Sequence, residues 1–291
     1  MARKRHKLHL VREAEADGRT LAIFEEIKQA LGIPYVNMMF QAFASFPEFF
    51  ELFWQTLKPV LATREFFAFS ERIGAEGYTR MHNYFAVPDL RSRVAAMQFS
   101  PGAQNEIIRA VDLYHYNYPT LLLICAALAQ AFEDPREPSL DKVTVTAAHP
   151  LFGEKPIMVE ETVAPVPTRR VYEEIKRTLG TPFLNTCYLN FGRWPDFLQA
   201  YWESLKPVLK TPLYEHHRHA IESSALSCAS ELPEPLQLSL AHMEEAGVPA
   251  DDVNAITSLT ETFLNLLSKQ VLNIAFAKIA LDGGVRSQAA A

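Results

Sequence analysis

Four asparagines are the side chains whose type and placement best suit a binding or catalytic site. Asn37 and Asn185 lie in stretches that are otherwise apolar and aromatic, and Asn117 and Asn265 lie in the last long apolar segments of the two halves of the chain. An amide in apolar surroundings costs free energy unless it is hydrogen-bonded. Each asparagine therefore either bonds to neighbouring backbone or serves a ligand, and the sequence leaves both readings open.

The four asparagines occupy equivalent positions of an internal repeat. Residues 24–63 and 172–211 align at a constant shift of 148 with about 18 of 40 positions identical, far beyond what shared helical composition produces. The same shift places Asn37 on Asn185 and Asn117 on Asn265. Two such copies would pack most simply about a pseudo-two-fold axis, as a fused dimer. If they serve a ligand, Asn37 and Asn185 would then converge on a pocket between the copies, where the N-terminal ends of two helices favour an anion.

The repeat divides the 291 residues into three parts. We predict a first helical repeat over 1–133, a linker over 134–170 that contains six prolines and whose end belongs to the second copy, and a second helical repeat over 171–291. No segment outside the linker alternates apolar and polar residues over the length of a strand, whereas helical spacing is frequent. The predicted fold class is all-α, with two tandem homologous helical bundles.

Prolines and glycines mark the expected helix ends. Pro34 suits a first helical position, which would place Asn37 in that helix's first turn. Pro59 is expected to bend or restart a helix, and Gly74 and Gly77 to mark a turn. Ser100 before Pro101 is a strong N-cap signal. The helix that begins there is expected to kink or restart at Pro119, which lacks an N–H to donate.

The overall composition excludes several classes of partner and indicates where in the cell the protein is located. A net charge of -6 argues against a nucleic-acid or anionic-membrane surface, which needs a basic excess. No run of about 18 apolar residues and no signal-peptide core is present, and three scattered cysteines make no disulfide or zinc pattern. We expect a cytoplasmic protein whose partner is a small molecule and which binds neither nucleic acid nor membrane. Whether the fused dimer pairs into a further homo-dimer is left open.

Other groups with chemical potential have ordinary explanations. His216, His217 and His219 are expected to form a solvated helix face, since only His216 and His219 share a side of the helix. Cys187 is expected to be a packing residue, and the EEIK stretches at 25–28 and 173–176 to lie on solvated helix faces. No Gly-rich phosphate loop, HExxH or GxSxG motif occurs. We expect no metal and no cofactor.

The tandem LGxPxxN stretches, each followed by FP or WP, and the YNYP-TLLLI stretch resemble the group I (DehI-type) 2-haloacid dehalogenases. The resemblance extends from about Leu21 to Leu281. It implies an all-helical pseudo-dimer in which an aspartate of the second repeat activates a water that attacks a 2-halocarboxylate directly. That aspartate corresponds to Asn185, or to Cys187 if the alignment slips by two residues. Neither is a carboxylate, and an asparagine cannot act as a base at neutral pH.

The resemblance also implies the rest of the site. The family's active-site asparagine corresponds to Asn117, within a cluster that includes Tyr118, and a family tyrosine is replaced by Thr120. Tyr35 stands for a tryptophan, and three small residues become Asn37, Phe183 and Leu184. We therefore expect Asn185 and Asn117 in catalytic positions, and Tyr35, Asn37, Tyr118, Thr120, Phe183 and Leu184 around the substrate.

Two functions compete at this point. One is a hydrolase acting on a small 2-halocarboxylate, with Asn117 positioning water or substrate and Asn185 near the reacting carbon. The other is a small-molecule binding protein, or an enzyme of different chemistry, that uses the same pocket for a mostly apolar ligand with an amide-bonding group.

Overall fold

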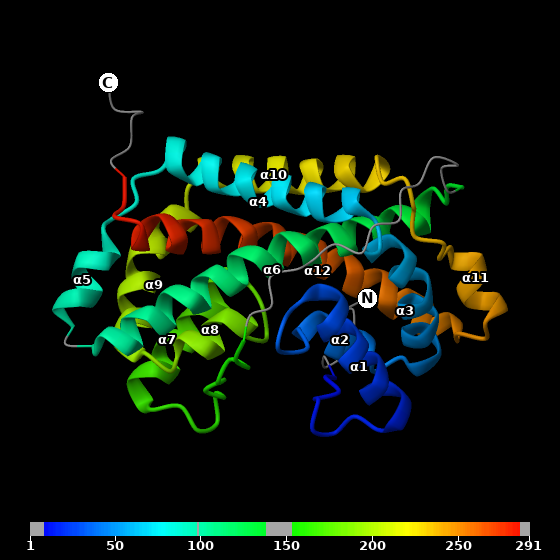
Figure 1. Cartoon of the computed structure of the whole chain (residues 1–291), viewed down its shortest axis with the longest axis horizontal. Helices are drawn as coiled ribbons and strands as arrows, with labels where there is room; N and C mark the ends of the chain where they lie inside the picture. The colour runs from blue at the N-terminus through cyan, green and yellow to red at the C-terminus, as the bar shows by residue number, and fades with distance from the viewer. Residues whose placement is uncertain (1–8, 98, 138–152, 286–291) are drawn as a thin grey trace, which may run out of the picture.

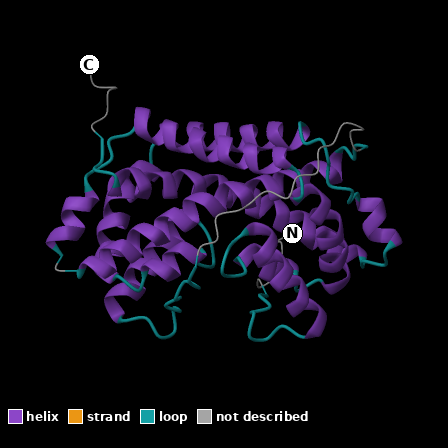
Figure 2. Cartoon of the chain, viewed as in Figure 1, coloured by secondary structure: helices purple, strands orange, loops and turns teal. Residues whose placement is uncertain are grey.

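The computed structural model describes residues 9–97, 99–137 and 153–285, and in this part of the chain every regular element is a helix (Figure 2). The twelve helices are α1 (Gly18–Leu31), α2 (Met38–Phe43), α3 (Pro47–Leu61), α4 (Arg64–Tyr84), α5 (Leu90–Ala96), α6 (Pro101–Glu133), α7 (Val166–Leu179), α8 (Thr186–Phe191), α9 (Pro195–Leu209), α10 (Pro212–Ser230), α11 (Leu240–Glu245) and α12 (Ala250–Leu281). The all-α fold class is confirmed. None of the described helices is long and apolar enough to cross a membrane.

The helices occur twice in the same order. Helices α1, α2 and α3 reappear as α7, α8 and α9 with both ends displaced by 148 residues, the shift that aligns the sequence. The glycines that end α1 and α7 show why the local structure repeats. Gly32 and Gly180 both adopt the left-handed conformation, with φ of 63° and 71°, which closes a helix without the strain that a side chain would add.

The two halves share one interior. Helices α6 and α12 pack against each other near the middle of the molecule, and α4 and α10 lie side by side above them (Figure 1). Helices α1–α3 and α7–α9 flank this centre at opposite ends, and α5 of the first half packs on α9 and α12 of the second. The buried apolar residues of both halves belong to a single cluster. The central layer therefore positions the N-terminal ends of α2 and α8 relative to each other.

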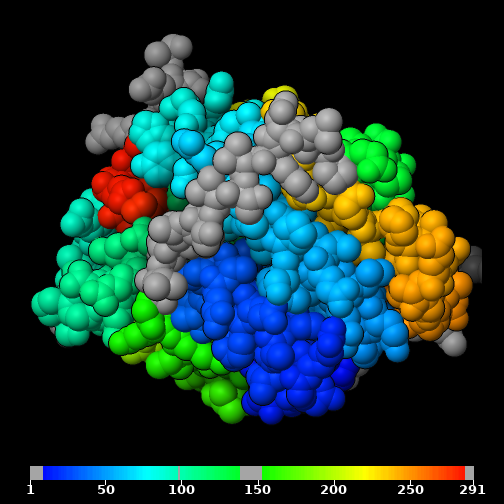
Figure 3. All heavy atoms as spheres, turned by 45° about the vertical axis from the view of Figure 1, so that its right-hand side comes forward, coloured from blue at the N-terminus to red at the C-terminus, as the bar shows by residue number. Residues whose placement is uncertain are grey.

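Contacts between the halves also extend to the surface. Figure 3 shows the start of the described chain against the described end of the predicted linker, and Lys155 and Glu13 form an ion pair of 2.9 Å there. At the other end of the molecule, Val87 and Val285 exchange backbone hydrogen bonds of 2.9 and 2.8 Å.

Several predicted helix breaks are absent. Pro59 lies inside α3, and α4 continues through Gly74 and Gly77 without a turn. Pro119 lies inside α6, which is one continuous helix. The Pro119 ring faces Gly74, where an added Cβ would lie 3.2 Å from the ring. The glycine thus makes room for the proline between two packed helices. The predicted turn at Gly74 and Gly77 is wrong, and of the predicted kink or restart at Pro119 the restart is wrong. Ser100 does cap α6, accepting from the Ala103 N–H at 3.2 Å.

The linker is only partly described. Helix α7 begins at Val166, inside the predicted linker at the end that we assigned to the second copy, while residues 138–152 lie outside the described residues. The predicted division of the chain at 134–170 therefore stays a prediction.

The repeated EEIK motif has a structural task in both halves. The indole N–H of Trp54 donates to Glu26 at 2.8 Å, and that of Trp202 donates to Glu174 at 2.9 Å. Hydrogen bonds from Lys58 and then from Trp54 hold the pKa of Glu26 below its usual value. Glu26 is exposed and Glu174 is partly exposed, so the expected solvated face holds for Glu26, but the expectation missed the tryptophan partners of both carboxylates.

Candidate functional site

A small cavity lies where the N-termini of α2 and α8 approach α6 and α12. It is lined by Asn37, Met38 and Tyr118 of the first half and by Asn185, Thr186, Phe263, Leu266 and Leu267 of the second. Its volume of about 10 Å³ is enough for roughly one water molecule. Residues of both halves therefore form its walls.

Six of the eight lining residues form repeat-related pairs. Asn37 corresponds to Asn185, Met38 to Thr186 and Tyr118 to Leu266 at the shift of 148. Sequence reasoning missed the apolar residues because it followed polar groups. Leu266 could have been predicted, because the repeat makes it the equivalent of Tyr118. Nothing in the sequence distinguished Phe263 from other core residues.

Asn37 and Asn185 have the same backbone conformation but different hydrogen bonding. Both are N-caps with φ of -67°, so Asn37 precedes its helix and does not lie in the first turn as predicted. The Asn37 side chain accepts from the Met39 N–H at 3.0 Å. The Asn185 side chain makes no such bond, although Asn185 is only 7 % exposed. Of the two amides, that of Asn185 is the one left available to a ligand.

Asn117 is joined to Tyr35 in the interior. Its Nδ2 donates to the Tyr35 hydroxyl at 2.8 Å, while its buried Oδ1 has no hydrogen-bond partner among the described residues. Burial raises the pKa of Tyr35 well above its usual value, so the phenol stays neutral and cannot act as a base at pH 7. Asn265, the repeat equivalent of Asn117, is exposed.

Tyr118 and Cys187 connect α6 to the first turn of α8. The Tyr118 hydroxyl accepts from the Cys187 N–H at 3.2 Å. Burial raises the pKa of the Cys187 thiol to about 12. A thiolate is the reactive form of cysteine, so this side chain supplies no nucleophile near neutral pH.

The remaining predicted residues do not line the cavity. Thr120 is fully buried, and its hydroxyl lies 2.8 Å from that of Ser70 on α4. Leu184 is buried in the core. The ring of Phe183 lies 6.5 Å from that of Phe263, which does line the cavity. The structure thus brings Asn37, Tyr118 and Asn185 together at the cavity and places the others behind or beside it.

The interior behind Cys187 is polar, and the equivalent interior of the first half is not. Cys187 donates to Gln270 at 3.6 Å, and Asn273 accepts from Tyr214 at 2.7 Å and donates to Tyr188 at 3.2 Å. All five side chains are buried. The equivalent residues of the first half are Met39, Leu122, Cys125, Phe66 and Phe40. A buried polar network of this kind specifies one arrangement of its members, and here it ends at the first turn of α8.

The cavity holds no acid–base pair. None of its described lining residues is an aspartate, glutamate or histidine, and no group of three possible metal ligands occurs among the described residues. In the histidine cluster, His216 and His219 are exposed, but His217 is buried. The Arg80 guanidinium lies 3.0 Å from His217 Nδ1 and can only donate, so His217 is neutral there. The expected solvated face holds for two of the three histidines.

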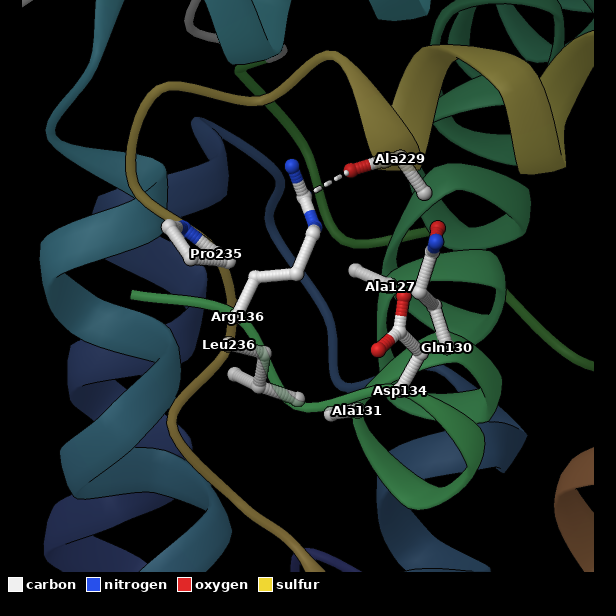
Figure 4. Close-up of a pocket in the computed structure, with 8 residues that line it drawn as sticks. All are labelled: Ala127, Gln130, Ala131, Asp134, Arg136, Ala229, Pro235 and Leu236. Carbon is white, nitrogen blue, oxygen red and sulfur yellow. Dashed lines mark hydrogen bonds between the residues drawn. The ribbon is translucent and has the colours of Figure 1, made fainter. Parts of the chain in front are cut away.

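A second small hollow lies at the C-terminal end of α6 (Figure 4). The Arg136 side chain extends into it and donates to the Ala229 carbonyl oxygen at 2.9 Å. The remaining volume is about 10 Å³. The arginine already fills this hollow, so it offers no space for a ligand.

Comparisons with known proteins point to one family. A model of the family described as halocarboxylic acid dehydrogenase DehI matches residues 34–188. An (R)-2-haloacid dehalogenase of Pseudomonas putida is 27% identical over 92% of this chain and 91% of its own length. A configuration-inverting 2-haloacid dehalogenase of Alcaligenes xylosoxydans xylosoxydans is 22% identical over 93% of both chains.

Solved structures agree over nearly the full length. The complex of a D-2-haloacid dehalogenase with L-LA superposes with a TM-score of 0.89 at 26% identity, covering 95% of this chain and 97% of the other. A mutant of a D-2-haloacid dehalogenase in complex with D-2-CPA gives the same values.

Proposed function

The chain belongs to the DehI family, and from this premise we propose that it is a hydrolase-like member that holds a small carboxylate in the cavity between its two halves. The cavity lacks the general base that dehalogenation needs. We further propose that the halves are related by a pseudo-two-fold axis that passes through the cavity. The three repeat-related pairs in the cavity lining support this axis.

One observation carries the proposal: Asn185 lines the cavity and its side chain makes no cap hydrogen bond. By the family resemblance, the catalytic aspartate corresponds to Asn185, or to Cys187 if the alignment slips by two residues. An amide can donate to a carboxylate or orient a water, but it cannot take a proton from that water at neutral pH. The neutral Tyr118 and Cys187 beside it do not replace the base.

The cavity must enlarge to admit such a ligand. A volume of about 10 Å³ is far below that of a three-carbon acid, and sites for small molecules usually exceed this by more than tenfold. Phe263, Leu266 and Leu267 form the apolar side of the cavity. Rotation of these side chains is the smallest change that makes room next to Asn185.

The alternative is a binding protein without dehalogenation, or an enzyme of different chemistry. Its support is the neutral character of the polar groups around the cavity, together with the buried Asn117 Oδ1 that has no described partner. An uncharged acceptor of this kind suits a ligand with an N–H or O–H group rather than one with a second acid.

We propose a cytoplasmic location, since Cys125, Cys187 and Cys228 are all free and reduced cysteines are usual in that compartment. Further homo-dimerisation stays open.

Chloride release from D- and L-2-chloropropionate tests the proposal. We expect the unaltered protein to stay at background with both enantiomers, while calorimetry detects binding of at least one of them. Asn185→Asp should gain chloride release, because it restores a carboxylate to the cavity wall. Asn37→Asp, at the equivalent position of the first half, is the matched control and should gain none.

Each result decides something. Catalytic turnover by the unaltered protein would overturn the claim that the base is missing. Failure of both enantiomers to bind would overturn the small-carboxylate assignment and favour the alternative. Binding without any gain from Asn185→Asp would mean that the cavity shape, as well as the base, differs from that of a working dehalogenase.

A further inference from the structure

The contact between α4 and α10 joins the two halves of the molecule outside the central pair of helices (Figure 1). Near the C-terminal end of α4, the Arg80 guanidinium lies 3.0 Å from Nδ1 of His217 on α10. We name this pair the Arg80–His217 latch. An arginine can only donate a hydrogen bond, so Nδ1 accepts and the imidazole proton lies on Nε2. The bond therefore exists only while His217 is neutral.

The His217 ring is enclosed by the end of α4. It is 3 % exposed, and its Nε2 is buried without a hydrogen-bond partner among the described residues. The rings of Tyr84 and Phe85 lie 4.5 and 5.6 Å from it. A charged imidazole in this place would lose its hydration without gaining an acceptor, which is costly.

The charged groups that act on the ring disfavour a second positive charge. Among the described residues they are Arg80 of α4 and His216 of α10, whereas α6, α9 and α12, which also pack on α10, contribute none. Burial, then the charge of Arg80 and then His216, lowers the pKa of His217.

The nearby carboxylates are held by other cations. Glu76 of α4 pairs with Arg80 at 2.6 Å. On α10, Arg218 pairs with Glu215 at 2.8 Å and also with Glu222. No described carboxylate therefore bonds to His217 and compensates its protonation.

The repeat shows that the contact between α4 and α10 does not need a histidine. At the equivalent positions of the other half, His217 is replaced by Phe69 and Arg80 by Cys228. There the Arg72 guanidinium lies 4.8 Å from the Phe69 ring and donates to Cys228 at 2.9 Å. Burial raises the pKa of the Cys228 thiol, so nothing in that contact changes charge between pH 5 and 8.

The latch lies where the first half crosses to the second. Tyr84 ends α4, and Val87 exchanges backbone hydrogen bonds with Val285. Helix α5 then packs on α9 and α12. Release of the latch would therefore loosen the end of α4 and the segment that crosses, before it affects the rest of the core.

We propose that the Arg80–His217 latch is an acid-sensitive switch that releases the end of α4 from α10 when His217 takes up a proton. Protonation removes the acceptor of the Arg80 bond and leaves two cations in contact. An imidazole that is free in the open form titrates at about pH 6.5, whereas the closed latch excludes the proton. The closed form is thus fully favoured above that pH, and its population relative to the open form falls by up to about tenfold per pH unit below it. This inference is independent of the function proposed for the cavity.

Hydrogen exchange followed by mass spectrometry at pH 7.5 and pH 5.5 tests the proposal on the full chain. The opening constants, corrected for the intrinsic exchange rate at each pH, should rise about tenfold at pH 5.5 in peptides that cover residues 78–88 and 212–221. Peptides that cover α1–α3 should change by less than about twofold. An unchanged opening constant at the latch overturns the proposal, and so does an equal rise in both regions, because acid would then act on the whole fold.

Variants identify the titrating group. His217→Gln keeps an acceptor for Arg80 but takes up no proton, so its opening constant should be the same at both pH values. His219→Gln is the matched control, since His219 is exposed on the same helix, and it should keep the rise of the unaltered protein. A rise that persists in His217→Gln, or that is lost in His219→Gln, means that another group carries the pH dependence and overturns the assignment.

A second substitution covers the case in which glutamine impairs folding, which circular dichroism detects. His217→Phe introduces the residue of the other half, where phenylalanine is accommodated against α10 without a histidine. It should remove the pH dependence in the same way. If the rise at pH 5.5 persisted in this folded variant, the latch would not be the switch.

Discussion

Tyr35 and Asn117 lie 82 residues apart in the chain, and the Asn117 amide donates to the Tyr35 hydroxyl at 2.8 Å in the fully enclosed interior. The bond ties the segment before α2 to the middle of α6. It also fixes the orientation of the amide, so that Oδ1 is the atom left without a described partner. One hydrogen bond therefore decides which polar atom near the cavity remains free.

Tyr35→Phe should lower the free energy of unfolding by about 1–3 kcal/mol, because it leaves the buried Asn117 N–H without an acceptor. Urea unfolding followed by circular dichroism measures this. Asn265→Ala is the matched control, since Asn265 is exposed at the equivalent position, and it should stay within about 0.5 kcal/mol of the unaltered protein. Equal effects of the two changes would contradict a structural role for the Tyr35–Asn117 bond.

Gly77→Ala should destabilise the protein by about 1–3 kcal/mol through overpacking. An added Cβ would lie 2.7 Å from Val271 Cγ1 on α12, which outweighs the gain of about 1 kcal/mol in helix propensity. Gly18→Ala is the control, because nothing lies within 4 Å of a Cβ there, and it should be neutral or stabilising. Thermal unfolding compares the two, and a stable Gly77→Ala variant would mean that α4 and α12 can separate at little cost.

The polar interior of the second half predicts coupling between Tyr214 and Asn273. Tyr214→Phe removes the donor of a 2.7 Å bond to Asn273 Oδ1 and should cost about 1–3 kcal/mol. In a double-mutant cycle with Asn273→Ala, we expect a coupling energy of about 0.5–3 kcal/mol. Additive effects of the two changes would show that this bond adds nothing to stability.

Stability should fall at alkaline pH. Burial raises the pKa of the Cys187 thiol from 9.0 to about 12, so above about pH 9 the unfolded chain loses the thiol proton and the folded protein retains it. This contribution is complete below that pH and is lost as the pH rises towards 12, at up to about 1.4 kcal/mol per pH unit. Urea titrations from pH 7 to 10.5 should show a shallower decline for Cys187→Ala, and identical slopes would contradict the shift.

The repeat made the helix order predictable, because a shift of 148 residues carries capping glycines and apolar spacing along with it. The predictions that were wrong concern helices in which tertiary packing overrides the local preference of a glycine or a proline to end a helix. Gly74 and Pro119 each predict a break when considered alone, yet each fits against the other in the structure. A sequence does not show which distant residue will face a proline.

The candidate site was predictable only in its polar part. Asn37, Tyr118 and Asn185 carried a signal because amides and phenols are unusual in apolar segments. Phe263 and Leu267 had none, since apolar residues on a long helix are expected in any core. The sequence also could not predict that the Asn37 side chain caps its helix while the Asn185 side chain does not. The two residues have the same backbone conformation, and only the side-chain orientation distinguishes them.

The packing of α5 on α9 and α12, together with the bridge from Val87 to Val285, bears on how any ligand enters. Proteins made of two separate lobes admit a ligand by hinge opening, with each lobe moving as a rigid body. In this protein α5 of the first half packs on helices of the second half, and both halves share one apolar core. A hinge motion would have to break that core. We therefore expect entry to the cavity between Asn37 and Asn185 to depend on local changes, such as rotation of Phe263, Leu266 and Leu267, and not on closure of lobes.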